Sequence, residues 1–368
     1  MFNVFDFLSN NNPVICYGAG RIGLEILGFF RCNNIEPLMF VQTGRPDYNT
    51  LLDIPVKSIN DVDFTVNYNW VVTVSEEKEE EIKTVLASRG INRYFLVKNQ
   101  HLREIRSEIM KKNVLLKDRN EGDRCFILAT GPSIKKQNLS FLKNEHVFSC
   151  SAGVLLDNYD YINPEFYVSA SVRNDYFSKA FDKLNHGEFG VEYFRFLEKT
   201  VKSNVVFLDY WDIPFVQKSG FLHKHDVYYL FQDGVWNERN SISDISKTTP
   251  SIPSVSIMML KIAMYMGYKK IYLLGTDHDQ LFRDKYDHAY DYNKMRKCGF
   301  GRLCDELIKD NDKSFPMRVV LESELDLFNQ YHIINNIAKK NGIEIYNATA
   351  GGRLDEFDRV CYESLFER

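Results

Sequence analysis

The stretch RCFILATGPSIKKQNLSFLKNEHVFSCSAG, residues 124–153, decides the fold class. An apolar run, Cys125–Ala129, leads directly into Thr130-Gly131-Pro132-Ser133, and a second apolar run follows at Val147–Cys150. Two buried strands joined by a segment that begins as a polar helix are typical of a parallel α/β unit. The turn places Ser133 and the next amides at a helix N-terminus, which favours an anion. The alternative is a simple turn in which Ser133 is only the helix N-cap.

The alternation of strands and helices continues toward the C-terminus. Further strands are predicted at residues 166–169, 204–208, 227–230, 270–275 and 343–346, and helices at residues 254–266 and 321–340. Residues 278–320 are rich in Asp, Lys, Arg and Tyr and have no regular period. Since so long an irregular segment in a compact domain usually has a function, we expect it to form a lid.

The N-terminal part reads as a separate α/β unit. Strands are predicted at residues 13–17, 36–41, 70–75 and 94–97, and helices at residues 21–31 and 76–89. Residues 101–122 form a charged helix with a polar end, which we interpret as a connector. The predicted fold class is therefore α/β, with two Rossmann-like parallel-sheet domains, residues 1–100 and 123–368, and a helical connector at 101–122.

A glycine fingerprint marks the first unit. Gly18, Gly20 and Gly23 form a GxGxxG pattern between a strand and a helix, which suits a pyrophosphate at the helix N-terminus. A dinucleotide site also needs Asp or Glu after the second strand, and that place holds Gln42-Thr43-Gly44. A small nucleotide, or a turn that only builds the scaffold, is therefore favoured over a nicotinamide dinucleotide.

Composition narrows the class of protein. The 368 residues carry 46 Lys and Arg against 50 Asp and Glu, a net charge of −4, so nucleic acid is not expected as a partner. The seven cysteines have no tight CxxC pair, which favours a reducing cytoplasm. No apolar run reaches the roughly 20 residues that span a bilayer. His223 and His225 have no third ligand at metal spacing and read as surface residues.

Polar residues follow several predicted strands at their carboxyl ends, where α/β sheets bind ligands. The strand at 270–275 delivers Asp277 and His278, and the helix before it begins at Ser254. The last strand runs into Asn347-Ala348-Thr349-Ala350-Gly351-Gly352. Asp277 is expected to orient a ribose or a metal-bound water, or else only to cap the next loop. These residues are candidates for one wall of a nucleotide site.

The irregular segment contains a candidate general base. His288 lies in KYDHAYDY, residues 285–292, beside an acidic residue and several tyrosines. On a lid over a ligand it could take a proton near neutral pH, whereas a lone loop histidine is usually solvated.

Three stretches together resemble a known family. FILATGPSIKKQNLSFLKNEHVFSCS and SVSIMMLKIAMYMGYKKIYLLGTDH are similar to the bacterial lipooligosaccharide sialyltransferases, with their Gly-Pro-Ser turn and their helix–strand unit ending in Gly-x-Asp. With IYNATAGGRLDEFDRVCYESLF, they also resemble a broader family of pterin pyrophosphokinase-like domains, flagellin-modifying accessory transferases and polysaccharide-cluster proteins. The resemblance covers residues 124–368. The N-terminal unit is similar to a small nucleotide-fold domain found ahead of sugar-modifying acyltransferases.

The resemblance implies a sialyltransferase-like domain, a GT-A variant, in a glycosyltransferase of surface polysaccharide or lipooligosaccharide assembly. The donor would be a CMP-activated acidic sugar (sialic acid, Kdo or a related acid), the partner a glycan acceptor, and neither metal nor another cofactor would be essential. The enzyme would be cytoplasmic. Peripheral binding at the inner membrane and oligomerisation both stay open. Catalytic roles would fall to His288, Asp277, His278 and Tyr286. Donor binding would fall to Thr130, Gly131, Pro132, Ser133, Ser151, Ser169, Ser171, Ser254, Asn347, Thr349, Gly351 and Gly352.

The sequence departs from the sialyltransferase pattern at Ser151, where the relatives have Asn, and in the tyrosine pair after the Asp, for which Tyr286 is one candidate. Two other functions stay open. One is a Mg²⁺-dependent pterin-type pyrophosphokinase, with Asp277 and Asp279 as metal ligands. The other is a non-catalytic scaffold that binds a nucleotide.

Overall fold

The structure is a computed structural model, and it describes residues 4–46, 48–170, 188–220, 224–235, 241–282, 288–297 and 316–367. It confirms the α/β class, with two largely parallel sheets. The chain divides into two compact units. The first holds the described residues of 1–109, 172–195 and 211–221, and the second holds the others.

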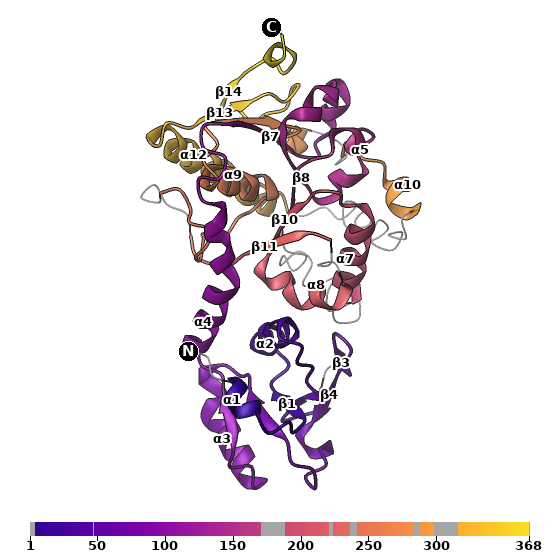
Figure 1. Cartoon of the computed structure of the whole chain (residues 1–368), viewed down its shortest axis with the longest axis vertical. Helices are drawn as coiled ribbons and strands as arrows, with labels where there is room; N and C mark the ends of the chain where they lie inside the picture. The colour runs from indigo at the N-terminus through magenta and orange to yellow at the C-terminus, as the bar shows by residue number, and fades with distance from the viewer. Residues whose placement is uncertain are drawn as a thin grey trace. The chain divides into compact units, whose positions relative to one another are not determined.

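The first unit is built on a six-stranded sheet (Figure 1). Its strands, in spatial order, are β3 (Thr50–Leu51), β4 (Ile54–Ser58), β2 (Met39–Gln42), β1 (Val14–Tyr17), β5 (Asn69–Val72) and β6 (Tyr94–Leu96). Its helices include α1 (Val4–Leu8), α2 (Arg21–Cys32), α3 (Glu79–Ser88), most of α4 (Asn99–Met110), and α8 (Ile213–Ser219). The central strands pair in parallel, because helices return the chain to the same edge of the sheet each time.

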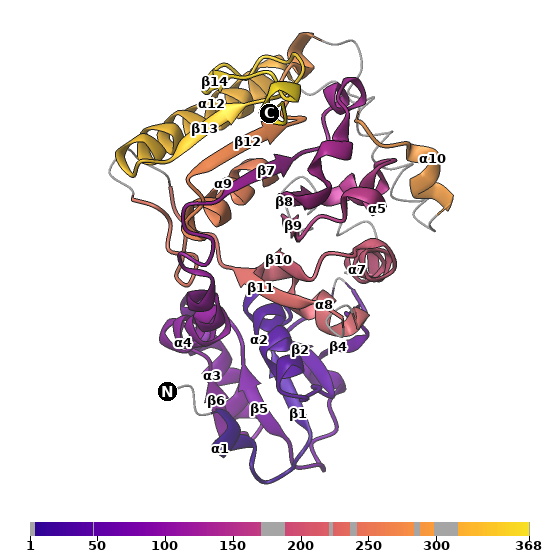
Figure 2. The same cartoon turned by 45° about the horizontal axis from the view of Figure 1, so that its top comes forward.

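The second unit contains an eight-stranded sheet whose pairs are parallel (Figure 2). Its strands, in spatial order, are β11 (Asp226–Leu230), β10 (Val205–Asp209), β9 (Phe166–Ser169), β8 (His146–Cys150), β7 (Arg124–Leu128), β12 (Lys270–Leu274), β13 (Glu344–Asn347) and β14 (Asp358–Arg359). Its helices include α5 (Tyr159–Ile162), α9 (Val255–Tyr265), α10 (Tyr292–Met295) and α12 (Met317–Lys340), and α7 (Glu188–Thr200) crosses the boundary between the units.

Both faces of this second sheet are covered. Helices α9 and α12 pack on one face in a single apolar cluster with alternate strand residues such as Ile127 and Leu273 (Figure 2). On the other face Tyr346, Tyr272 and Phe126 form a stacked aromatic row. Because both faces are buried at β7, β8, β9 and β12, these strands are continuous apolar runs, which explains why the sequence locates them correctly.

The strand order contains one reversal. The chain proceeds from β7 through β8 and β9 toward β11, and β12 then adds on the other side of β7. Loops that follow β7 and β12 therefore leave the same sheet edge in opposite directions. Such a switch point opens a crevice at the carboxyl ends of the strands, where α/β proteins bind ligands.

Candidate functional site

The loops after β7, β12 and β13 meet at the switch point, and Asp277 joins them. Its carboxylate accepts hydrogen bonds from the Ser133 amide at 3.2 Å and the Ser133 hydroxyl at 2.7 Å. Its backbone carbonyl accepts from the Arg353 amide at 2.7 Å. Asp277 is only 6% exposed, so its carboxylate lies inside the protein. Asp277 is thus a residue that positions the three loops.

Two glycines allow this close approach. A Cβ atom at Gly131 would lie 1.9 Å from the Asp277 Oδ2 atom, and one at Gly352 would lie 2.5 Å from the Asp277 carbonyl oxygen. Both contacts are far inside van der Waals distance. Gly131 and Gly352 are therefore required by packing within the chain, independently of any ligand.

The structure corrects the N-cap predicted at Ser133 and gives the Ser133 donors a partner within the protein, while the anion role stays a prediction. The segment after Gly131 is a five-residue 3-10 helix, η4 (Pro132–Lys136), whose N-cap is Gly131 rather than Ser133. The Ser133 amide and hydroxyl, both in a residue 3% exposed, donate to Asp277. The carboxylate of Asp277 is thus the partner of both donors. Asp277 therefore caps η4. The alternative predicted from the sequence was that Asp277 caps the loop that follows it.

Asn347 and Thr349 also turn inward. The Asn347 amide group donates to the Leu354 carbonyl at 2.7 Å, and its oxygen accepts from the Thr349 amide at 3.0 Å. The Thr349 hydroxyl oxygen accepts from the Thr276 amide at 3.2 Å. The two residues, 1% and 5% exposed, hold the loop together through these side-chain bonds. Their role in donor binding stays a prediction.

Arg359, on β14, is a residue that the sequence did not single out. Its guanidinium donates to the carbonyls of Thr349, Gly351, Gly352 and Leu354 at 2.7–3.3 Å. A planar group with five N–H donors suits such a turn of carbonyls. No sequence signal distinguishes this arginine from a surface arginine.

His288 lies at the end of β7, as a role in the site requires. Its Nδ1 atom is 3.3 Å from the Thr130 hydroxyl, and the next amide, of Ala289, donates to the Thr130 carbonyl at 2.8 Å. Its ring stacks on Tyr290 with centroids 4.8 Å apart, and Tyr292 packs against both. The structure therefore brings together two predicted site residues that are 158 positions apart.

His278 occupies a different setting. Its Nε2 atom is 2.8 Å from the hydroxyl of Tyr331 on α12, which lies 2.5 Å from the Ser256 hydroxyl. Ser256 in turn is 2.7 Å from the hydroxyl of Ser254, the N-cap of α9. Burial lowers the pKa of His278 to about 4, so the imidazole is neutral at pH 7 and a weak base. A chain of hydroxyl groups thus links Ser254 to His278 through Ser256 and Tyr331. The sequence alone does not distinguish Tyr331 from other aromatic residues of the core.

The remaining predicted residues are spread along the same edge. Ser151 follows β8 with φ +48°, a left-handed conformation that Asn adopts readily, and its carbonyl accepts from the Tyr167 hydroxyl at 2.9 Å. Ser169 ends β9, is buried, and donates to the Ala170 carbonyl at 3.2 Å. Ser171 and Tyr286 lie outside the described residues.

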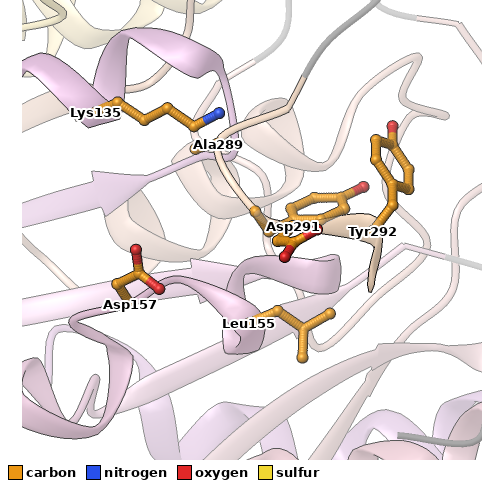
Figure 3. A pocket seen from close by; sticks show the side chains of 7 residues that line it. Lys135, Leu155, Asp157, Ala289, Asp291 and Tyr292 are labelled. Atoms are coloured by element: carbon orange, nitrogen blue, oxygen red, sulfur yellow. The ribbon is translucent and has the colours of Figure 1, made fainter. Parts of the chain in front are cut away.

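A cavity of about 310 Å³ opens beside His288 (Figure 3). Its walls come from η4, from the loop after β8 and from the segment that carries His288. The lining residues are Lys135, Leu155, Asp157, Ala289, Tyr290, Asp291 and Tyr292.

The glycine fingerprint of the first unit shapes a turn. A Cβ atom at Gly18 would lie 2.6 Å from the Thr73 carbonyl oxygen, and one at Gly23 would lie 2.2 Å from the Gly18 carbonyl oxygen. Gly20, the N-cap of α2, faces open space instead. Two of the three glycines are therefore needed by the scaffold. A small nucleotide at Gly20 remains a prediction.

Among the residues that the structure describes, no group of three or more His, Cys, Asp or Glu side chains could hold a metal ion. In the described ranges, every helix is too short or too polar to cross a bilayer.

No protein-family model matches this sequence, and no curated protein matches it. Two solved glycosyltransferase structures are similar to this chain. One is the sialyltransferase CstII from Campylobacter jejuni in complex with a substrate analogue, cytidine-5'-monophosphate, at 16% identity and a TM-score of 0.35 over 66% of this chain and 86% of that one. The other is the MAf glycosyltransferase from Magnetospirillum magneticum AMB-1, at 11% identity and a TM-score of 0.37. That match covers the whole of this chain and 62% of the other, longer chain.

Proposed function

We propose that this chain is a metal-independent glycosyltransferase that transfers an acidic sugar from a CMP donor to a glycan of the cell surface. The observation that carries the proposal is the contact between His288 and Thr130. It puts an imidazole at the switch point of a parallel sheet, which is where such folds bind a nucleotide. The sequence resemblance supports the donor class.

In the proposed reaction His288 accepts the proton of the acceptor hydroxyl. The acceptor oxygen forms a bond to the anomeric carbon while the bond from that carbon to the phosphate oxygen breaks, and CMP leaves with the electron pair. The Thr130 hydroxyl, Ser254 at the N-terminus of α9, and Tyr286 would stabilise the departing phosphate. Asp277 would act at a distance, by holding the loop that carries Thr130 against the loop after β12.

This assignment gives the two histidines different roles. His288 is half-buried and borders a cavity wall, so a substrate hydroxyl can approach it. His278 is bonded to Tyr331 and its depressed pKa makes it a poor proton acceptor. We therefore assign His288 as the base and His278 as a structural partner of α9 and α12.

Calorimetric titration with CMP, with and without Mg²⁺, tests the donor class. The proposal expects CMP to bind equally in Mg²⁺ and in EDTA, and expects His288→Ala to abolish sugar transfer from the CMP donor while CMP affinity changes less than about twofold. His332→Ala, at an exposed histidine paired with Glu356, is the matched control and should keep full activity.

Three results would contradict the proposal. Binding of ATP that depends on Mg²⁺, without CMP binding, would favour pyrophosphate transfer. CMP binding without donor turnover or hydrolysis would favour a scaffold. Full transfer activity in His288→Ala would remove this residue from the role of base.

A further inference from the structure

The hydrogen-bonded chain from His278 to Ser254 joins the loop after β12 to the N-terminus of α9. Its inner members are buried: Tyr331 is 0% exposed and Ser256 is 3% exposed. Its two ends, Ser254 and His278, are half-buried. Because the inner hydroxyls are shielded from solvent, each uses its neighbours in the chain as donor and acceptor.

The chain runs in one direction at a time, because each hydroxyl has a single proton. If the Nε2 atom of His278 carries a proton, it donates to Tyr331, and each hydroxyl then donates to the next as far as Ser254. If Nε2 is bare, Tyr331 donates to it and all three bonds reverse. The tautomer of His278 therefore determines which part of the Ser254 hydroxyl faces outward.

The two directions give Ser254 opposite roles. Its oxygen already accepts a hydrogen bond from the Ser256 amide at 3.3 Å, as the N-cap of α9. With Nε2 protonated, this oxygen also accepts from the Ser256 hydroxyl, so both lone pairs are used and the proton is left for a ligand. With Nε2 bare, the proton points to Ser256 and one lone pair is left. Ser254 thus attracts an anion in the first direction and repels it in the second.

Two features of the structure favour the first direction. Ser254 stands at the positive end of α9, an 11-residue helix, where a hydroxyl is most stable with its oxygen toward the amides and its proton away from them. The Nδ1 atom of His278 has no hydrogen-bond partner among the described residues, so none of these groups imposes the opposite tautomer. Since burial lowers the pKa of His278 to about 4, the ring holds a single proton at pH 7.

We propose that His278, Tyr331 and Ser256 are positioning residues for the donor phosphate. The Nε2–H tautomer of His278 directs the hydroxyl proton of Ser254 outward, to a phosphate oxygen of the CMP donor. This assignment rests on the proposed function, in which Ser254 faces that phosphate. Ser254 makes the contact, and the buried chain keeps its proton from turning inward.

The tautomer is measured without any ligand. Two-bond ¹H–¹⁵N correlation spectra of protein labelled with ¹⁵N-histidine distinguish the Nε2–H form from the Nδ1–H form at pH 7. The signals of His278 are those that disappear in His278→Gln. We expect the Nε2–H form in the unmodified protein. The Nδ1–H form would overturn the proposal, because it reverses the chain.

Titration with CMP and with cytidine tests the consequence, because these ligands differ only in the phosphate. Ligand-observed NMR is the readout, since it also reports weak binding. Tyr331→Phe interrupts the chain and keeps the ring. We expect it to weaken CMP binding about tenfold, the loss of roughly one hydrogen bond to a charged group, and cytidine binding by less than about twofold.

Tyr159→Phe is the matched control. Tyr159 is also buried, in α5 ahead of β9, and its hydroxyl is 3.5 Å from that of Ser203. The substitution removes a buried hydroxyl outside the chain, so the affinities for CMP and for cytidine should both stay unchanged.

A pair of substitutions at His278 separates the effect from a folding defect. His278→Gln keeps an N–H donor for Tyr331, and His278→Met has a similar size without one. Both meet the same left-handed backbone, with φ +44° at this position. CMP affinity should stay within about threefold in the Gln variant and fall about tenfold in the Met variant, with cytidine affinity unchanged in both.

The outcomes separate this proposal from the proposed function. If CMP binds, but Tyr331→Phe weakens CMP and cytidine alike or weakens neither, the chain is only structural and the proposed function stands. Equal CMP affinity in His278→Gln and His278→Met would refute the chain in the same way. If the unmodified protein does not bind CMP, the proposed function fails, and the phosphate role of Ser254 fails with it.

Discussion

The replacement of Asp277 by alanine tests whether this residue holds the switch-point loops. The substitution removes the acceptor of two hydrogen bonds, from the Ser133 amide at 3.2 Å and from its hydroxyl at 2.7 Å. Both donors belong to a residue that is 3% exposed, so water does not replace the lost partner.

The size of the effect follows from these two bonds. A hydrogen bond to a charged group contributes about 1.5–3 kcal/mol, which bounds the loss at roughly 3–6 kcal/mol. The hydrogen bond from the Ser133 amide is at the long end of the normal range. Both hydrogen bonds come from the same serine, so their contributions are not independent. We expect Asp277→Ala to lower the local free energy of unfolding by about 3 kcal/mol. Asp277→Asn keeps an acceptor and should cost about 1 kcal/mol.

Hydrogen exchange followed by mass spectrometry is the suitable assay. A chain of two units need not unfold in one step, so a single global midpoint would be ambiguous. Tryptophan fluorescence would report mainly on the other unit, because two of the three tryptophans, Trp70 and Trp211, belong to the first unit. Peptides that cover residues 129–134 and 275–278 report directly on the two loops.

The asparagine variant and a double-mutant cycle make the test decisive. Ser133→Ala combined with Asp277→Ala should cost clearly less than the two single effects added, because both remove the same hydroxyl bond. The reasoning fails if Asp277→Ala changes exchange by less than about 0.5 kcal/mol, the scale of an ordinary surface substitution. It fails equally if Asp277→Asn is as harmful as Asp277→Ala.

Three further outcomes follow from the same geometry. Gly131→Ala should destabilise the second unit by at least about 2 kcal/mol in urea, since its Cβ would lie 1.9 Å from Asp277, whereas Gly153→Ala, with its nearest contact at 3.5 Å, should cost less than half of that. The pKa of His278 is near 6.5 in the unfolded chain and about 4 in the folded protein. As the pH falls from 6.5, the unfolded chain therefore binds a proton that the folded protein does not. The contribution of His278 to stability is full above pH 6.5 and falls by about 3 kcal/mol toward pH 4. Urea unfolding at several pH values should show this fall, and it should be absent in His278→Asn. Arg359→Met should increase hydrogen exchange in residues 348–354, where four carbonyls lose the guanidinium as a donor, and unchanged exchange there would contradict the anchoring role.

Local sequence patterns were sufficient to predict most strands of the second sheet. The strands β7, β8, β9 and β12 agree with their predicted ranges to within one residue at each end, because a strand buried on both faces is a short apolar run. The position of Asp277 at the carboxyl end of β12 follows from this alone. So does the expectation that ligands bind at this edge of the sheet.

Partners across the fold were not predictable in the same way. Leu321 and Leu325 continue the apolar period of α12, yet they are 50% and 63% exposed, since the core meets this helix only from Leu327 onward. The helix α8 belongs to the first unit, where Ile213 and Pro214 contact the Gly28 position of α2, although it follows β10 in the chain. Periodicity describes one face of an element and does not identify what covers it.

The sequence by itself determined that a Gly-Pro-Ser turn ends a buried strand and that Asp277 ends another. Only the tertiary structure decided that these two features bind each other, so that the Ser133 amide serves a carboxylate of the protein. It also decided that His288, and not His278, stands at Thr130 beside a cavity. The physical reason is that a hydrogen bond depends on distance in space, and these partners are 144 and 158 residues apart along the chain.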